Sequence, residues 1–459
     1  PLSDEMLRDR AATPPSSGAP AEDDRPPFPI DAEVLAVLGR LWSAGYAGYL
    51  VGGGVRDALL GLPVSDWDIA TDARPERIMR LFPGSSYQNR FGTVLARGLE
   101  ITTFRCDHRY ADHRRPDSVT FSRDIFEDLA RRDLTINAMA WGRRAPEMAA
   151  RMVDPADGQG DLQAGLVRAV GDPDRRFDED ALRLLRAVRI AARLDFEIEP
   201  MTRKAMEEHA ADIEWVSEER VGSELRQMLA AETPSRAIRL MAGTGILATT
   251  LPELSTLSDD GLDRSLGVLD AAAAHQGAEQ VVLAGLLFEL DADAAREVLA
   301  RLRLPGRDAE AVVALMGAAA ESYAPDWSDA QVRAFMSRLP AELIDDVLTL
   351  RAARATALGT DASAEAHLAE RDTTQRLAAP PLELADLAID GRDLRDTLGL
   401  PESPLIGTIL ERLLADVIDD PDLNERMTLL TRANLVLDEL LQGGGASTGS
   451  HPAHRPPIG

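Results

Sequence analysis

Residues 49–71 read YLVGGGVRDALLGLPVSDWDIAT, and this stretch decides the fold of the first part of the chain. The apolar run at residues 49–51 is typical of a buried strand, and three glycines follow it directly. Glycines after a strand let the backbone approach a ligand closely, and a helix that begins after them at Val55 would aim free N–H groups at an anion such as a triphosphate. Arg56, in the first turn of that helix, can hold phosphate oxygens with two N–H groups. The stretch therefore predicts a strand, a phosphate-binding turn and a helix.

Two carboxylates follow the glycine turn at close range, in the sequence Asp66-Trp67-Asp68. On a strand, residues i and i+2 share a face, so both carboxylates would point one way and Trp67 the other. Like charges that close repel unless a cation joins them, and hard oxygen ligands suit Mg²⁺. The alternative is a polar strand end with two solvated acids. The nearby glycines and Arg56 favour a magnesium site.

Composition and length set limits on the class of protein. A chain of 459 residues is long enough for about three domains. The sequence shows no apolar run of membrane-spanning length and no signal peptide ahead of the first domain. Its single cysteine, Cys106, excludes an internal disulfide framework and a cysteine-based metal site. We expect a soluble, cytoplasmic protein.

The net charge of −27 is unevenly distributed. Residues 1–250 hold 33 basic and 41 acidic side chains, a balance of −8, whereas residues 251–459 hold 17 and 36, a balance of −19. The acidic excess thus lies mostly outside the region of the motifs. Any contact with RNA must then come from local arginine patches rather than from a basic field over the whole protein.

The order of elements predicts a mixed sheet with helices, followed by a helical remainder. Residues 31–45 and 75–81 are expected to be helices, and residues 92–97 and 100–105 resemble two adjacent strands. From residue 176 onward apolar residues recur at helical spacing and strand patterns do not return. Both ends, residues 1–27 and 443–459, are rich in small and polar residues and are expected to be disordered.

Two polar segments interrupt this pattern. Residues 106–120 form a long charged stretch between strands, which is either a functional loop or a solvated hairpin. Residues 126–141 are expected to place their apolar members on one helical face, with Arg131, Arg132 and Asp133 projecting elsewhere. An arginine pair alone is weak evidence for a site.

A second informative stretch, residues 176–189, reads RFDEDALRLLRAVR. Asp180, Arg183, Arg186 and Arg189 recur every three residues, which keeps them on one helical face. That face is either a solvated salt-bridge surface or a base-reading surface. A carboxylate can accept a hydrogen bond from the amino group of C or A while an arginine donates to the neighbouring ring acceptor. U and G present a carbonyl where that amino group would be, so the carboxylate would face another acceptor. One Asp/Arg pair could therefore select C and A without a template.

Together these stretches resemble the bacterial class II tRNA nucleotidyltransferases, the family of CCA-adding enzymes and poly(A) polymerases. The resemblance is specific over residues 46–230 and weaker beyond. Its motifs are residues 50–70, residues 131–138 (RRDLTINA), the hinge at Asp154-Pro155 with Gly158 and Asp161-Leu162, residues 179–183 (EDALR), residues 219–225 (ERVGSEL) and a tail motif at residues 387–398. The tail motif carries Asp390 where the family commonly has Asn.

The resemblance implies an α+β fold, with an N-terminal polymerase-β-like head of mixed sheet and helices before an elongated all-α neck, body and tail. Its implied parts are a disordered tail (1–27), a catalytic head (28–148), a hinge and neck for nucleotide selection (149–250), a body (251–380), a tail that binds the tRNA elbow (381–442) and a disordered end (443–459). It also implies roles for ten residues. Asp66 and Asp68 would bind Mg²⁺, with Glu100 as a third carboxylate. Gly53 and Arg56 would contact the triphosphate, and Arg132 would contact the nucleotide. Asp180 and Arg183 would read the base, with Arg186 and Arg189 beside them.

The implied activity is template-free addition of CMP, CMP and AMP to the 3′ end of tRNA from CTP and ATP, by two-metal phosphoryl transfer. Three alternatives stay open: a poly(A) polymerase, an enzyme that adds only A, and a silent RNA-binding relative. Residues 90–94, around the start of the strand expected at residues 92–97, resemble the form found in CCA-adding enzymes, which speaks against a poly(A) polymerase. Residues 106–120 supply the loop that relatives adding only CC lack, so the enzyme that adds only A is the harder alternative to exclude. The expected partners are tRNA, ATP and CTP, with no membrane, and the oligomeric state is left open between monomer and homodimer.

Overall fold

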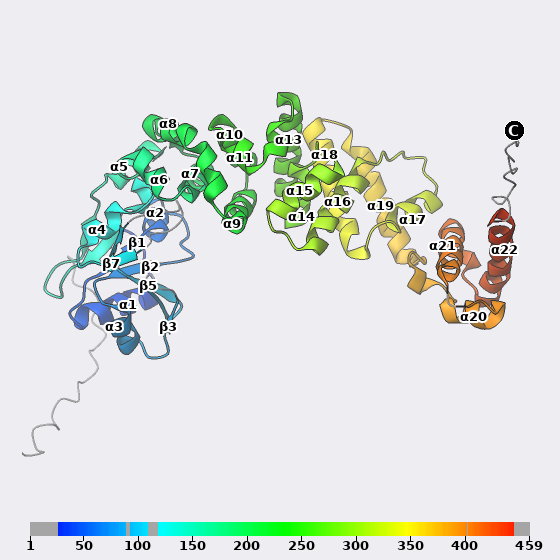
Figure 1. Ribbon diagram of the computed structural model, residues 1–459, viewed down its shortest axis with the longest axis horizontal. Coiled ribbons are helices and arrows are strands. Elements are labelled where there is room, and N and C mark those ends of the chain that lie inside the picture. Colours follow the sequence, from blue (N-terminus) through cyan, green and yellow to red (C-terminus); the bar gives the residue numbers. More distant parts are fainter. Residues whose placement is uncertain (1–25, 89–91, 109–117, 402, 445–459) are drawn as a thin grey trace, which may run out of the picture. The chain divides into compact units, whose positions relative to one another are not determined.

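The computed structural model describes residues 26–88, 92–108, 118–401 and 403–444 (Figure 1). The chain divides into two compact units. The first comprises residues up to 228 together with 239–250, and the second comprises residues 229–238 and everything from 251 onward. The first unit contains every strand of the described chain, and the second is helical, which confirms the predicted order of a mixed-sheet head before a helical remainder.

A seven-stranded sheet organises the first unit, in the order β3-β4-β5-β2-β1-β8-β9. Its strands are β1 Gly48–Val51, β2 Asp68–Thr71, β3 Ser86–Tyr87, β4 Thr93–Ala96, β5 Leu99–Thr103, β8 Ala140–Arg143 and β9 Arg151–Val153. The pair β2 and β5 is parallel and the other neighbours are antiparallel, so the sheet is mixed as predicted. A separate antiparallel pair, β6 Arg105–His108 and β7 Ser118–Phe121, frames residues 109–117, so most of the predicted loop lies outside the described residues.

The central strands end along two opposite sides of the sheet, which are called its edges below. The strand register makes these two edges chemically different. At one edge Val51 pairs with Asp68, and Asp68 pairs with Glu100 on β5. At the other edge Gly48 pairs with both Thr71 and Arg143. Acidic residues therefore collect at the first edge and arginine at the second.

Four helices support this sheet: α1 Ala32–Ser43, α2 Gly53–Leu59, α3 Pro75–Leu81 and α4 Ile125–Ala130. The predicted bounds of α3 are confirmed, and α1 lies within the predicted range of 31–45. The helix α4 packs on one face of the sheet, where Ile125 and Leu129 share a core cluster with Tyr49, Phe104 and Val153.

The prediction of one helical segment over residues 126–141 is wrong. The helix α4 ends at Ala130, a 3₁₀ turn occupies Thr135–Asn137, and β8 begins at Ala140. The cause is the buried carboxylate of Asp133, which accepts hydrogen bonds from the Leu134 N–H at 2.8 Å and from Asn137 Nδ2 at 3.3 Å. Such local bonds offer the backbone an alternative to the helical ladder.

Residues 176–189 also differ from the prediction of a single helix. The helix α6, Pro173–Glu179, ends before Asp180, which is extended at φ −156°, and α7 runs over Leu182–Leu194. Asp180 therefore lies in the break between two helices rather than on the face that carries the arginines. The apolar residues Leu182, Leu185 and Val188 of α7 are buried.

The remaining elements of the first unit are mostly helical. They are α5 Gly158–Ala164, β10 Leu166–Val167, β11 Glu197–Ile198, α8 Pro200–Glu208, η3 Ala210–Trp215, α9 Glu218–Leu229, α10 Ser235–Gly243 and α11 Ile246–Thr250, of which α9 and α10 reach the boundary between the units. The expectation that no strand follows residue 176 is wrong at β11, a two-residue strand that pairs in parallel with β10.

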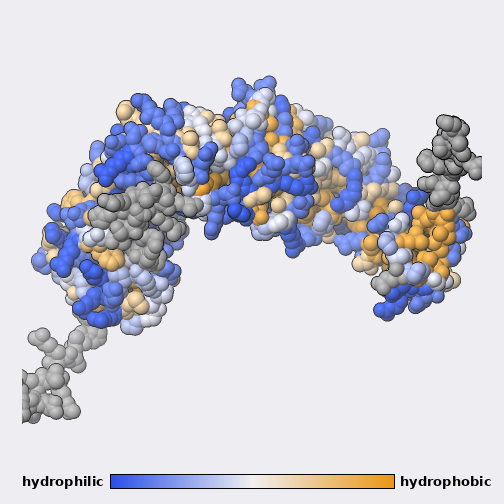
Figure 2. Space-filling view, in the orientation of Figure 1, coloured by the Kyte–Doolittle hydropathy of each residue, from blue (hydrophilic) through white to orange (hydrophobic). Residues whose placement is uncertain are grey.

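The second unit is built from helices, as the pattern of its sequence predicts. Its helices are α12 Pro252–Ser255, α13 Asp259–Ala274, α14 Glu279–Leu286, α15 Ala292–Arg301, α16 Gly306–Ala320, α17 Asp329–Met336, η4 Ala341–Leu343, α18 Ile344–Leu358, α19 Ala362–Ala378, η5 Leu384–Asp386, α20 Gly391–Leu398, α21 Pro404–Asp419, η6 Pro421–Leu423 and α22 Arg426–Gly444. Leu394, Ile409, Leu413 and Leu429 are buried in a cluster of their own. Outside that cluster α22 leaves Met427, Leu435 and Leu441 exposed. Figure 2 shows an apolar area at this end of the chain. Across the described ranges, no helix combines the length and the apolar character that a membrane span requires.

Candidate active site

Three carboxylates gather at the acidic edge of the sheet. Asp68 begins β2, and Glu100 is its direct partner on the parallel strand β5, so their side chains lie on the same face. Asp66 precedes β2 instead of belonging to it, yet the predicted alternation is present, because Asp66 and Asp68 are exposed while Trp67 is buried. All three acids line an open cleft of about 710 Å³, which is within the range of ligand sites.

The electrostatics of this edge favour a cation. Although Asp68 is exposed by its surface area, the surrounding protein removes part of its hydration and thereby raises its pKa. The neighbouring Glu100 and Asp66 raise this pKa further, and Arg132 lowers it. The edge therefore holds more negative charge than its surroundings neutralise. Among the described residues no group of three or more His, Cys, Asp or Glu side chains is close enough to form a complete metal site. An edge with two neighbouring carboxylates can still hold a divalent metal ion when substrate phosphates and water complete its coordination.

The glycine turn brings an arginine to the same place. Gly52 follows β1 directly and has φ +76°, and a Cβ there would lie 3.1 Å from Arg132 Nη1 and 3.3 Å from Asp68 Oδ2. Glycine is therefore required both by the backbone and by the close approach. Helix α2 begins at Gly53, two residues earlier than predicted.

Arg132 is loosely held beside Asp68. Its Nη2 donates to Asp128 at 3.3 Å and its Nη1 to the Asn137 carbonyl at 3.5 Å, both long for charged groups. Its Nε is buried and has no hydrogen-bond partner within the described chain. Because a buried donor without a partner is costly, the site is suited to an anionic ligand that Arg132 would meet.

Arg56 is more firmly held than its predicted role suggests. It is buried, and its guanidinium donates to Asp57 Oδ1 at 2.8 Å and to Asn137 Oδ1 at 2.7 Å. Burial lowers the pKa of Arg56. A Cβ on Gly53 would be 3.4 Å from Arg56 Nη2, so the guanidinium folds back over the first residue of α2. Contact between Arg56 and a triphosphate stays a prediction.

The two residues expected to read the base have partners in the structure. Asp180 accepts from Arg220 Nη2 at 2.8 Å and from the Leu182 N–H at 3.2 Å. Arg183 is buried, and it donates to Glu179 at 2.7 Å and to the Arg131 carbonyl at 3.2 Å. Arg183 therefore ties α7 to the turn that carries Arg132.

Arg186 and Arg189 continue this network. Arg186 donates to Asp133 Oδ2 and Arg189 to Glu224 Oε2, at 2.7 and 2.6 Å respectively. Arg186 also lowers the pKa of Asp68, so the arginines of α7 act on the acidic edge. The alternative of a solvated salt-bridge face does not describe these residues, because their carboxylate partners are buried.

Sequence reasoning did not assign roles to several members of this network. Glu179, Asp133, Asn137, Arg220 and Glu224 all lie inside quoted motifs, yet spacing alone does not show which of them pair. Their partners are up to 81 positions away along the chain, as for Arg56 and Asn137. The signal available in the sequence was their position inside the motifs.

Asp133 gives a test of this network. Burial alone would raise its pKa, but Arg186, Arg183 and Asn137 hold the pKa well below its ordinary value. A carboxylate whose pKa is lower in the folded protein than in the unfolded chain, where it is about 3.9, stabilises the fold at pH values above about 3.9. This contribution to stability is lost as the pH falls through the pKa of the folded state. Asp133→Asn should lower the free energy of unfolding by about 2–4 kcal/mol at pH 7, a range that allows for the exposed part of Arg186.

Urea unfolding of the wild type and Asp133→Asn at pH 7, 4 and 3 measures this difference. It should be largest at pH 7 and shrink toward pH 3. Glu207→Gln, which removes a carboxylate from an exposed pair with Arg203, is the matched control and should change stability far less. A difference that stays constant across this pH range would show that the Asp133 charge does not stabilise the fold.

Comparison with known proteins identifies the family. Residues 48–168 match the poly A polymerase head domain, residues 195–257 match the probable RNA and SrmB-binding site of polymerase A, and residues 275–433 match the putative tRNA nucleotidyltransferase domain 2. The CCA-adding enzyme of Geobacillus thermodenitrificans (strain NG80-2) is 34% identical over 415 residues, which cover 88% of this chain and 95% of that protein. The chain belongs to the CCA-adding enzyme family.

Other members of the CCA-adding enzyme family agree with this assignment. The enzyme of Latilactobacillus sakei is 44% identical over 223 residues, which cover 48% of this chain and 55% of that protein. The crystal structure of the Bacillus stearothermophilus CCA-adding enzyme in complex with CTP has a TM-score of 0.72 and 29% identity, and the match covers 90% of this chain and all of that one. The family and fold implied by the sequence motifs are thereby confirmed.

Proposed function

We propose that this chain adds CMP, CMP and AMP to the 3′ end of tRNA from CTP and ATP, without a nucleic-acid template. The observation that carries the proposal is the register that sets Glu100 beside Asp68, with Arg132 and the Gly52 turn at the same strand end. The family assignment supports transfer of nucleotides to tRNA, and the related enzyme crystallised with CTP supports CTP as a substrate.

In the proposed reaction the 3′-hydroxyl oxygen of the RNA bonds to the α-phosphorus of the nucleotide, and pyrophosphate leaves. Asp66 and Asp68 would hold Mg²⁺, which supplies charge stabilisation at the reacting phosphate and activates the hydroxyl. Glu100 would add a third carboxylate to this edge. Arg132, Gly53 and Arg56 would bind and orient the triphosphate, because backbone N–H groups and guanidinium groups are suited to phosphate oxygens.

The base would be selected at the break between α6 and α7. Asp180 would accept from the amino group of C or A, and Arg183 would donate to the adjacent ring nitrogen. Asp180 is paired with Arg220 in the structure, so base reading requires that this pair opens or shares the carboxylate. Arg186 and Arg189 would position the helix through Asp133 and Glu224.

One assay separates this function from the two catalytic alternatives. Purified protein is given tRNA that ends at the discriminator base, with labelled CTP and ATP added separately and together. The proposal predicts two C residues with CTP alone and a complete CCA end with both. Addition of A only to tRNA that already ends in CC would indicate an A-adding enzyme, and a ladder of A residues a poly(A) polymerase. No incorporation in any mixture would indicate a silent relative.

The segment at residues 106–120 is proposed to govern the change from C to A. Deleting residues 110–116, which lie outside the described residues, should leave CC addition intact and abolish addition of the terminal A. The reason is that the segment is long and polar and is framed by β6 and β7 next to the head sheet. The readout is the length of the product after incubation with both nucleotides. Equal loss of C and A addition, or loss of neither, would contradict this role.

Several broader expectations belong to the same proposal. The protein is proposed to act in the cytoplasm, where its tRNA and nucleotide substrates are found. The head, neck, body and tail boundaries at residues 148, 250 and 380 are proposed as functional divisions, with residues 381–442 binding the tRNA elbow. Monomer and homodimer are both compatible with this reaction.

A further inference from the structure

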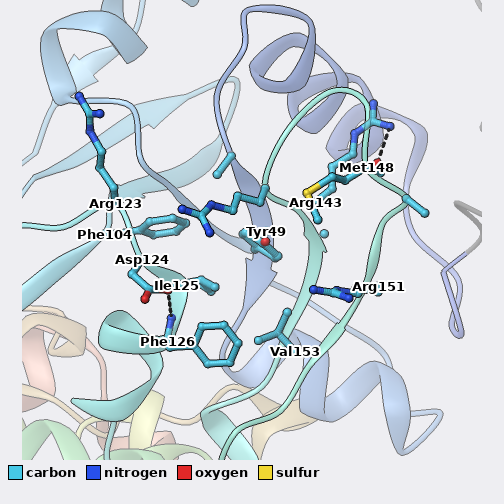
Figure 3. A pocket seen from close by; sticks show the side chains of 14 residues that line it. Tyr49, Phe104, Arg123, Asp124, Ile125, Phe126, Arg143, Met148, Arg151 and Val153 are labelled. Atoms are coloured by element: carbon cyan, nitrogen blue, oxygen red, sulfur yellow. Dashed lines mark hydrogen bonds between the residues drawn. The ribbon is translucent and has the colours of Figure 1, made fainter.

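A second cavity lies at the edge of the head sheet opposite the carboxylates (Figure 3). It is lined at this edge by Ala47 before β1, Gly142 and Arg143 at the end of β8, and Arg151 at the start of β9. In Figure 3, Tyr49 lies at its centre, with Phe104 on one side and Arg151 on the other. None of the residues given a role in the reaction above lines this cavity.

The cavity gathers positive charge, part of which the nearby carboxylate of Asp72 offsets. Arg123, Arg143, Arg144 and Arg151 line it, and Asp124 is the only acid among the lining residues. Asp124 is itself occupied as the N-cap of α4, where it accepts from the Phe126 N–H at 3.1 Å. Such a concentration of cations is unusual in a chain whose net charge is −27.

Three of these arginines are available to a ligand. Arg123, Arg144 and Arg151 are exposed, and none of them forms an ion pair or a side-chain hydrogen bond with any residue that the structure describes. Arg143 differs, because its guanidinium stacks on the Trp42 ring at 4.3 Å and donates to the Met148 carbonyl at 3.4 Å. No ion pair or side-chain hydrogen bond in the described chain therefore explains the presence of the exposed arginines at this cavity.

The floor of the cavity supplies a hydrogen-bond donor. Burial raises the pKa of the Tyr49 phenol, Arg151 and Arg144 oppose that shift, and Asp124 and Asp72 add to it. Tyr49 therefore stays protonated at neutral pH, and Arg144 and Arg151 line the same cavity. A neutral phenol in a cavity lined by guanidinium groups can donate a hydrogen bond to an anion and carries no charge that would repel it.

The size of the cavity restricts the ligand. Its volume of about 100 Å³ is well below the range of about 300–1,000 Å³ for small-molecule sites, whereas the cleft at the acidic edge is within that range. A volume of this size corresponds to about three water molecules, which suits one phosphate group but not a nucleotide. We propose that this cavity binds a backbone phosphate of the RNA substrate, through Arg144, Arg151 and Tyr49.

The position of the cavity is consistent with one RNA strand reaching both sites. Tyr49 and Asp68 lie on the same face of the sheet, because Tyr49 pairs with Ala70 and residues two apart share a face. Helix α4 packs on that face. Asp124, at the N-terminal end of α4, lines the cavity, and Arg131 and Arg132 follow the last residue of the helix. Six helical residues span about 9 Å, so the phosphate would lie a short distance upstream of the reacting 3′ end. This inference rests on the proposed function, because it requires the ligand to be RNA.

The test compares the double variant Arg144→Gln/Arg151→Gln with the wild type. Binding of tRNA that ends at the discriminator base is measured by fluorescence anisotropy at several salt concentrations. The affinity should fall about tenfold at low salt, and the slope of log K against log salt should decrease by about 0.7–0.9 for the lost phosphate contact. In the addition assay KM for tRNA should rise about tenfold, while kcat at saturating tRNA and KM for CTP should stay unchanged.

The matched control is Arg77→Gln/Arg80→Gln on α3, which removes the same charge from exposed arginines of the head. It should bind tRNA as the wild type does. Equal losses in both double variants would overturn the proposal, because a general loss of charge would then explain them. Wild-type affinity and slope in Arg144→Gln/Arg151→Gln would overturn it as well. The single variants are measured too, and thermal melting checks that each remains folded.

A third arm distinguishes RNA phosphate from free phosphate. Inhibition by added pyrophosphate and by inorganic phosphate should be the same in the wild type and in Arg144→Gln/Arg151→Gln. Weaker inhibition in the variant with unchanged tRNA binding would assign the cavity to the free anion and contradict the proposal. If the wild type binds tRNA but adds no nucleotide, the proposed function fails, while the anisotropy measurement still decides whether this cavity contacts RNA.

Discussion

Asp68→Asn is expected to lower the rate of nucleotide addition at least about a thousandfold without destabilising the protein. Loss of a metal ligand removes several kcal/mol of transition-state stabilisation, and each 1.36 kcal/mol corresponds to about a tenfold change in rate. The fold should tolerate the change, because Asp68 is charged in a partly buried place where Glu100 and Asp66 already disfavour its ionisation. The thermal melting temperature should therefore be unchanged or slightly higher.

Asp72→Asn is the matched control at the opposite end of the same strand. Asp72 Oδ1 accepts from the Ala47 N–H at 2.8 Å, a bond that the asparagine oxygen can keep, and it faces no part of the cleft. Its rate of CMP addition should equal that of the wild type. Near wild-type activity in Asp68→Asn, or an equal loss in Asp72→Asn, would remove Asp68 from the reaction.

Asp180→Ala is expected to relax the selection of C and A by about 5- to 150-fold against U and G, the equivalent of about 1–3 kcal/mol. The reason is that no carboxylate then accepts from the amino group of C or A or repels the carbonyl of U or G. Single-nucleotide incorporation with each of the four triphosphates measures the effect. Use of UTP or GTP should become detectable while use of CTP and ATP falls.

The structure provides a sharper pair of variants at this position. Asp180 also accepts from the Leu182 N–H at the start of α7, so Asp180→Ala removes a hydrogen bond to the first turn of this helix as well as a charge. Asp180→Asn keeps an oxygen for that hydrogen bond, and it should still lose selectivity. Asp174→Ala, an exposed acid of α6, is the control and should keep full selectivity. Full selectivity in both Asp180 variants would mean that the base is read elsewhere.

The sequence predicted the sheet well because its local signals and its tertiary structure agree. The run at residues 49–51, the glycine turn and the helix Pro75–Leu81 each have a local cause, namely apolar strand residues, positive φ and a proline at a helix start. Asp66 and Asp68 were predicted for the same reason, because they are close in sequence and follow the glycine turn. Glu100, the second residue of β5, was predicted only from the family resemblance.

The errors arose where buried polar contacts override periodicity. Residues 126–141 have a helical pattern, but Asp133 binds the backbone at Leu134 and receives Arg186 from a helix 53 positions later. The break at Asp180 has a similar origin, because its carboxylate is held by Arg220 from α9. Apolar spacing contains no information about such long-range ion pairs, so the sequence could show that these residues belong to motifs but not which of them touch.

The acidic edge of the sheet is proposed to bind the metal that accompanies the nucleotide. Isothermal titration calorimetry of CTP binding, with and without Mg²⁺ and in the absence of RNA, tests this metal site independently of catalysis. We expect Mg²⁺ to tighten CTP binding to the wild type and to Asp72→Asn but not to Asp68→Asn. An equal effect of Mg²⁺ on all three proteins would contradict the assignment of the metal to this edge.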